Sequence, residues 1–170
     1  MSIAAAVLAI SCSELADPLP SAEDFNGAGN LSIQVTGTIY AFVEEEFSGM
    51  RSITAKVTNV SEVDYYALLG DRFNSSLEQE TLYIAEGSGG YLESLSGDGR
   101  WSSIERGLMT EGVGIIVLKP DHQYLLLFVL PLPVTNPPKG AYRLRIDYSS
   151  KKDASANVSF SDYSDAFIIE

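Results

Sequence analysis

Cysteine and histidine are nearly absent from this sequence, since Cys12 and His122 are the only ones in 170 residues. A single cysteine cannot form an intramolecular disulfide, so the fold must be held together by its hydrophobic core. The same scarcity leaves zinc without its usual nitrogen and sulfur ligands. The composition therefore predicts neither a disulfide-rich scaffold nor a zinc protein.

Positive charge is also scarce, with 11 Lys and Arg against 23 Asp and Glu, a net charge of −12. Nucleic acid repels such a chain, and an anionic membrane surface does not attract it. The glycine motifs that hold phosphates or dinucleotides are missing too. We therefore expect no nucleic-acid partner and no cofactor.

Catalytic constellations are missing as well. His122 follows Asp121 directly, and a catalytic triad needs a nucleophile and an orienting acid that converge in space. The acidic clusters Glu44–Glu46 and Asp162–Asp165 lack the ligand spacing of a calcium loop, which favours solvated turn charges over a calcium site. These patterns predict a solvated turn histidine, no metal site and no enzymatic activity.

No apolar run is long enough to span a bilayer as a helix, which takes about twenty residues. The longest near the N-terminus, Ile3–Ile10, has eight residues, and Ser11 and Cys12 follow it. A short apolar run before a small residue and a cysteine is typical of a bacterial lipoprotein signal peptide. We therefore predict a lipid on Cys12 that attaches the chain to the membrane of a bacterial cell envelope.

The segment before the apolar run departs from a typical signal peptide. No Lys or Arg precedes the run, which indicates a late start or a clipped signal peptide. The alternative is an N-terminal strand with a buried thiol, but an alanine-rich run has poor strand propensity. Ser13 after the cysteine resembles the outer-membrane sorting pattern of Gram-negative lipoproteins.

The chain divides into three parts by composition. Residues 1–11 form the signal peptide, and residues 12–30 form a lipidated flexible tether rich in Pro, Gly, Ser and acidic residues. Residues 31–170 form one domain of ordinary size.

Within that domain, hydrophobic residues alternate with polar residues at a period of two, which predicts strands. The clearest runs are Leu31–Val43, Ile53–Val57 and Tyr142–Tyr148. Turns rich in Gly, Pro and Asn separate short strands, as in two packed antiparallel sheets. We predict an all-β sandwich with one short helix near 71–80.

Several short motifs resemble those of the immunoglobulin-like domains of secreted bacterial lipoproteins. The similar family patterns are a V-x-N-x-S strand end, an L-x-P-G turn and a G-x-Y-R-L strand. Here the matching segments are Asn59-Val-Ser61, Trp101 after a Gly-Asp-Gly turn, Leu118-Lys-Pro120-Asp121, Gly140-Ala-Tyr142-Arg143-Leu144 and Phe167-Ile168-Ile169. Asp121 stands where the family has glycine. The resemblance covers about residues 31–170 and implies an immunoglobulin-like fold and an extracytoplasmic location, but no single activity.

Three residues are predicted to have structural roles. Gly140 permits a tight turn, so that Tyr142 can fold back and bury its hydroxyl against a partner. Trp101 fills the interface between the sheets, with a ligand platform as the alternative.

The run Tyr124–Leu130 is apolar on both strand faces, whereas a sandwich strand normally has one wet face. The insertion 71–110 is the favoured cover for the second face, and the N-terminal segment or another molecule are the alternatives. The candidate binding surface consists of Tyr124, Leu126, Phe128 and Leu130.

Two functional classes follow from this sequence. The first is a lipid-anchored, monomeric, immunoglobulin-like module of the cell envelope that binds a protein or acts structurally. The alternative is a secreted or periplasmic inhibitor or small-ligand-binding sandwich.

Tyr142→Phe should lower the free energy of unfolding by about 1–3 kcal/mol, because a buried backbone group would lose its hydroxyl partner. Thermal or denaturant unfolding measures the change. A stability equal to wild type would contradict the predicted role of the hydroxyl.

Overall fold

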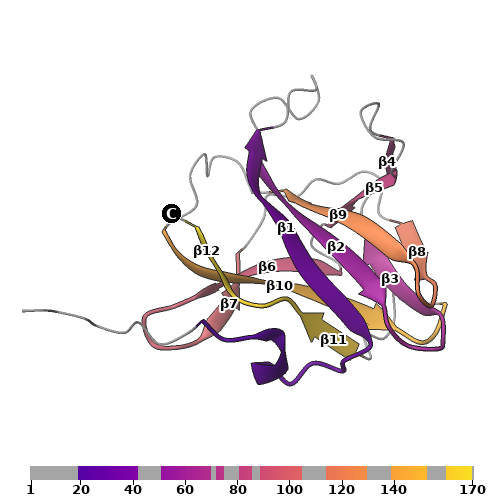
Figure 1. Ribbon diagram of the computed structural model, residues 1–170, viewed down its shortest axis with the longest axis horizontal. Coiled ribbons are helices and arrows are strands. Elements are labelled where there is room, and N and C mark those ends of the chain that lie inside the picture. The colour runs from indigo at the N-terminus through magenta and orange to yellow at the C-terminus, as the bar shows by residue number, and fades with distance from the viewer. Residues whose placement is uncertain are drawn as a thin grey trace, which may run out of the picture.

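The chain folds into two β-sheets that pack face to face (Figure 1). The computed structural model describes residues 19–41, 51–69, 72–74, 81–85, 89–104, 114–129, 139–152 and 160–169. These residues form twelve strands and one short 3-10 helix, η1 (Ala22–Asp24). The predicted all-β, two-sheet sandwich is therefore confirmed. No helix among the described residues is long and apolar enough to cross a bilayer.

The first sheet has the strand order β1-β2-β9-β5-β4. These strands are β1 (Leu31–Ala41), β2 (Arg51–Asn59), β9 (Gln123–Val129), β5 (Thr81–Ala85) and β4 (Arg72–Asn74). Neighbouring strands of this sheet pair in antiparallel orientation, except that β5 and β9 run parallel. β1 ends the sheet on one side, and its pairing with β2 is shifted after Val35 and again after Gly37.

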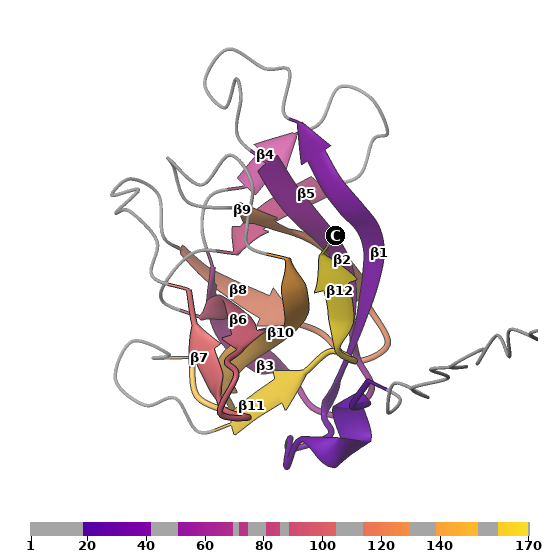
Figure 2. The ribbon, with the colours of Figure 1, turned by 90° about the vertical axis from the view of Figure 1, so that its left-hand side faces the viewer.

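The second sheet is built around β10 (Gly140–Ser149). The other strands are β7 (Trp101–Ser103), β6 (Gly90–Leu95), β3 (Tyr65–Leu69), β8 (Gly114–Leu118), β11 (Phe160–Tyr163) and β12 (Phe167–Ile169). β6 and β3 follow one another along one edge of β10, and β12 and β11 follow one another along the other. Both sheets thus end near each other on one side of the sandwich, at β1 and at β11 and β12 (Figure 2).

The core lies between the sheets and is made by alternate residues of the strands, as the period of two predicts. In β2 the core residues are Ile53, Ala55 and Val57, which are at most 1% exposed. The second sheet contributes large side chains from β10 and its neighbours. The members on this sheet are Tyr65, Ala67, Leu69, Leu92, Leu118, Tyr142, Leu144, Ile146, Tyr148 and Ile169. Burying each large apolar side chain contributes about 1.5–3 kcal/mol.

The predicted helix near 71–80 is wrong where the structure describes it, because Arg72–Asn74 form strand β4. Residues 75–80 lie outside the described ranges. The described parts of the insertion 71–110 also do not lie over a sheet face. β4 and β5 lengthen the first sheet beside β9, while β6 and β7 belong to the second sheet. Backbone pairing at a sheet edge satisfies their N–H and C=O groups, which packing over a face would not.

Gly89 is required by a close approach of two backbones. A Cβ at this position would overlap the carbonyl oxygen of Leu68. Gly89 is buried just before β6, and its own carbonyl accepts a hydrogen bond of 2.7 Å from the backbone N–H of Asp147. The glycine therefore holds β3, β6 and β10 together where the three strands meet.

Gly89→Ala should lower the free energy of unfolding by about 1–3 kcal/mol, because a methyl group forced into packed surroundings displaces the backbone. Gly97→Ala is the matched control, since a Cβ there meets no atom within 4 Å. Equilibrium denaturation of both variants measures the difference. Equal stabilities for the two variants would show that the backbones do not approach as described.

Candidate functional site

The structure buries the strand face that the sequence suggested for binding. Leu126 and Phe128 are both 0% exposed in the core, so the predicted surface is wrong for these two residues. Tyr124 is half-buried against the core, and its hydroxyl donates a hydrogen bond of 2.9 Å to the carbonyl of Val117. Leu130 lies outside the described residues. The physical reason is the central place of β9 between β2 and β5, which turns this face toward the second sheet.

The three predicted structural residues have different outcomes. Tyr142 is buried as predicted, 2% exposed, and its ring stacks on Phe167. Gly140 has no left-handed backbone, and the nearest atom to an added Cβ is Cε2 of Tyr142 at 4.0 Å, so no tight turn requires glycine there. Trp101 does not lie between the sheets. It packs beside Arg143, on the outer face of the second sheet.

The turn that follows β8 contains the only histidine. His122 is exposed, as predicted, and its Nδ1 lies 2.8 Å from the carbonyl oxygen of Pro120. Asp121 has a φ of 57°, the left-handed conformation that favours glycine. Among the described residues, no group of three or more His, Cys, Asp or Glu side chains is arranged to hold a metal ion. Cys12 and Glu44–Glu46 lie outside the described residues.

The segment before β1 is the first feature of the site that the structure adds. Residues 19–30, which the sequence assigns to a flexible tether, pack along the second sheet, and we call them the N-terminal strap (Figure 2). The backbone N–H of Ala22 donates to Oδ1 of Asp165 at 2.7 Å, and the N–H of Ala166 donates to the carbonyl of Pro20 at 2.9 Å. The tether prediction is therefore wrong from residue 19 onward.

Asp162 of β11 binds the backbone at the junction between the strap and β1. Its side chain accepts hydrogen bonds from three successive backbone N–H groups, those of Gly29, Asn30 and Leu31, at 2.6, 3.0 and 2.8 Å. It also accepts a bond of 2.6 Å from the hydroxyl of Tyr148. Asp162 is 2% exposed, so these donors replace the water that the carboxylate loses on burial.

Tyr148 completes this clamp from β10. Its hydroxyl also accepts a hydrogen bond of 3.1 Å from the side-chain amide of Asn30. Burial and the hydrogen bond to Asp162 raise the pKa of the Tyr148 hydroxyl well above its ordinary value. Tyr148 therefore stays protonated and remains a hydrogen-bond donor to the carboxylate.

The aromatic ring of Phe25 fixes the middle of the strap. Phe25 is 8% exposed and contacts the rings of Trp101 and Tyr163 edge-on, with centroids 5.5 and 5.8 Å away. The guanidinium carbon of Arg143 lies 4.4, 4.6 and 4.2 Å from the centroids of Phe25, Trp101 and Tyr163. Three rings around one cation give strong cation–π attraction because the site is largely desolvated.

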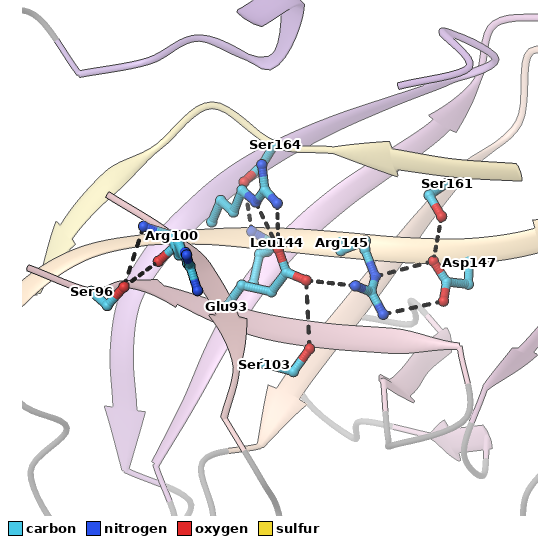
Figure 3. A network of polar contacts seen from close by, with 10 residues as sticks. Glu93, Ser96, Arg100, Ser103, Leu144, Arg145, Asp147, Ser161 and Ser164 are labelled. Atoms are coloured by element: carbon cyan, nitrogen blue, oxygen red, sulfur yellow. Dashed lines mark hydrogen bonds and ion pairs between the residues drawn. The ribbon is translucent and has the colours of Figure 1, made fainter. Parts of the chain in front are cut away.

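A chain of charges runs across the outer face of the second sheet, from Glu93 through Arg145 to Asp147 (Figure 3). Glu93 is 3% exposed and forms ion pairs of 2.7 Å with Arg143 and 2.6 Å with Arg145. Arg145 also pairs with Asp147 at 3.1 Å and stacks over the ring of Tyr91. Two acids and two arginines balance, so the buried network carries no net charge.

Two serines beside the network add hydrogen bonds to its carboxylates, whereas Nε of Arg145 has only the ion-pair contact with Asp147. Ser161 donates to Asp147 at 2.6 Å, and Ser103 donates to Glu93 at 3.5 Å. Burial acts to lower the pKa of Arg145, but the charges of Asp147 and Glu93 outweigh it and hold the pKa above its ordinary value. Each charged residue of the network is thus paired with a neighbour within the sheet. Arg143 connects the network to the strap through its contact with Phe25.

The two sheet edges leave an open groove of about 530 Å³ beside β1. Residues of β1 form one wall, and the segment from β11 to β12 forms the other. The lining residues are Ala22, Leu31, Ser32, Ile33, Gln34, Val35, Tyr163, Asp165, Ala166 and Phe167. This volume lies within the range of about 300–1,000 Å³ that small-ligand sites occupy.

Sequence reasoning did not find the strap, the network or the groove. A signal for the network was present in the sequence, since Arg143, Arg145 and Asp147 alternate with the core residues of β10. Alternation identifies them as facing outward but not as buried. The burial of Arg143 depends on Phe25 and Trp101, which are distant in sequence.

Comparison with known proteins identifies no family. No family model and no curated protein matches the sequence. The structure is similar to a crystal structure of the ApaA protein from Bordetella pertussis, with a TM-score of 0.42, 13% identity, and coverage of 82% of this chain and 91% of that chain. A β-glucosidase involved in saponin metabolism from intestinal bacteria has a TM-score of 0.35, 14% identity, and coverage of 82% of this chain and 16% of that chain. At these scores neither similarity bears on function.

Tyr148→Phe should lower the free energy of unfolding by about 1–3 kcal/mol at neutral pH, because Asp162 loses a buried donor. Because folding raises the pKa of Tyr148, its hydroxyl stabilises the folded state fully at pH values below the unfolded-state pKa of tyrosine. This contribution to the free energy of unfolding decreases as the pH rises above that value. The variant should therefore lose stability less steeply than wild type above about pH 10. Denaturant unfolding between neutral and alkaline pH measures this.

Tyr66→Phe is the matched control, because Tyr66 is half-exposed on β3. It should keep both the stability and the alkaline slope of wild type. Identical alkaline slopes for Tyr148→Phe and wild type would contradict the buried, protonated hydroxyl.

Proposed function

We propose that this chain is a lipid-anchored, immunoglobulin-like module of the bacterial cell envelope that binds a partner close to the membrane. Cys12 carries the lipid, and Ser13 directs the module to the outer membrane. The observation that carries the proposal is the N-terminal strap, because it binds the sandwich from Pro20 onward and leaves only a short spacer after Cys12.

The length of that spacer limits the distance between the module and the membrane. Residues 13–18 separate the proposed lipid site from the strap. At about 3.4 Å per extended residue, six residues reach about 20 Å. A tether through residue 30 would reach about three times as far. The module therefore stays near the lipid surface, and its strap side faces the anchor.

The immunoglobulin-like assignment draws support from two turns that resemble the family's motifs. The side chain of Asn59, 0% exposed, donates to the carbonyls of Val63 and Leu118 and accepts from the N–H of Ser61. The left-handed φ of Asp121 matches the glycine that the family has after proline. These motifs stabilise turns of the sandwich and are not ligand contacts.

Replacing Cys12 by Ala, in the full chain expressed from its own locus, should move the protein from the membrane fraction to the soluble fraction. The physical reason is that the spacer and the acidic domain offer no other membrane affinity. Membrane fractionation and incorporation of labelled palmitate measure the change. Ser11→Ala is the control, because it keeps a small residue before the cysteine and should leave the protein in the membrane. Unchanged fractionation of Cys12→Ala would overturn the anchoring.

A further inference from the structure

The outer edge of β1 presents to the groove backbone groups that are not paired with any residue in the described part of the chain. In an antiparallel ladder, the N–H and C=O of one residue point to the same side, and neighbouring residues alternate. The carbonyl of Asn30 accepts from the N–H of Val60, and the N–H of Leu31 points the other way, to Asp162. It follows that Ile33 and Val35 also direct their N–H and C=O groups away from β2.

Strand β12 offers the same kind of edge at Ile168, which directly follows the lining residue Phe167. Tyr142 pairs with Phe167, and Gly140 pairs with Ile169, along β10. The carbonyl of Leu144 accepts from the N–H of Ser164, so the even-numbered residues of β10 direct their backbone groups toward β12. By the same alternation, Ile168 directs its N–H and C=O away from β10. The side chain of Ile168 is 45% exposed.

The first five residues of β1, Leu31–Val35, have none of the usual protection against strand pairing. Natural sheets guard edge strands with charged residues, proline or bulges. β1 contains no charged residue and no proline in its 11 residues, although 20% of the chain is charged. The register shifts begin only after Val35, so Leu31–Val35 forms a regular edge. β8 is another uncharged strand at a sheet end, but the groove lies beside β1.

We propose that the groove accepts an extended peptide segment of a partner protein, which pairs with β1 as an added strand. The peptide's alternate apolar side chains enter the groove toward Phe167, and its backbone bonds to Ile33 and Val35. The inference rests on the proposed binding function and names its surface and its partner class.

Charge sets the preferred composition of this peptide. Asp165 is the one charged residue that lines the groove, and the chain has a net charge of −12. The surrounding potential attracts positive charge. A peptide with apolar residues at alternate positions and basic residues at its ends therefore fits best.

A second copy of the chain fits less well than a peptide. A stable interface buries about 1,200–2,000 Å² of total surface, which a five-residue edge paired between two folded domains does not supply. Each copy also carries a charge of −12, so two copies repel each other. An extended peptide can contact both walls of the groove and does not carry this repelling charge.

The test is an NMR titration of the soluble Cys12→Ala chain with the capped peptide Lys-Val-Thr-Val-Thr-Val-Lys. Saturable shifts should occur at the amides of residues 31–35 and 166–168. A peptide with proline in place of the central valine should bind at least tenfold more weakly, because it lacks a ladder donor. A peptide with glutamate at both ends should also bind at least tenfold more weakly.

Two variants test the walls separately. Val35→Pro removes an outward N–H of β1, which an edge strand tolerates, and Ala166→Trp fills the groove from the other wall. Each should weaken binding at least tenfold, while Lys119→Ala on an exposed turn should leave it unchanged. Circular dichroism of each variant checks that the sandwich is folded.

Absence of shifts at millimolar peptide, or shifts outside the groove, would overturn the inference. Equal affinity for the proline peptide and the valine peptide would do the same. A concentration-dependent dimer that protects residues 31–35 from hydrogen exchange would identify a second copy as the occupant and reject the peptide. None of these results affects the membrane fractionation of Cys12→Ala, so the anchoring and the peptide groove fail independently.

Discussion

The carboxylate of Asp162 joins the two sheets at their open side. It lies on β11 of the second sheet, yet it binds the backbone that leads into β1 of the first. Hydrogen bonds to a charged group contribute about 1.5–3 kcal/mol each, and an unsatisfied buried carboxylate would cost more than any one of them gains. The strap, the start of β1 and the hydroxyl of Tyr148 therefore form together or not at all. This coupling makes the N-terminal strap part of the domain.

The charge network under Phe25 adds specificity to this arrangement. Removing one member of a buried ion pair costs about 3–5 kcal/mol, because its partner remains charged without water. Glu93 faces two arginines, and Arg143 is held by three aromatic rings. A strap that shifted by one residue would withdraw Phe25 from this group and expose the pairs. Electrostatics and aromatic packing thus fix the same register that Asp162 fixes from the other end.

The strands were predictable because alternation is a local signal. Ile53, Ala55 and Val57 are buried with the polar residues between them facing outward, as their order in the sequence indicates. The wrong predictions for Trp101 and for the strap have one cause, which is that burial on the outer face depends on distant segments. Trp101 is a large aromatic residue of the kind found in cores, but it contacts Phe25 and Arg143 on the outer face. The strap has the composition of a linker, and the partners of its N–H groups at Ala22, Gly29 and Asn30 are carboxylates more than 130 residues later, those of Asp165 and Asp162.

The same fastening leaves the edge of β1 open beside the groove. The strap and its charge network occupy the outer face of the second sheet. Asp162 closes the gap between the sheets at Leu31, and the groove lies beside Leu31–Val35. A strand that entered there would meet backbone groups held in place by the ladder with β2, so little ordering cost falls on the domain. The hydrogen bonds of Asp162 that fix the strap therefore also fix the start of β1, whose edge is then ordered before a partner strand binds.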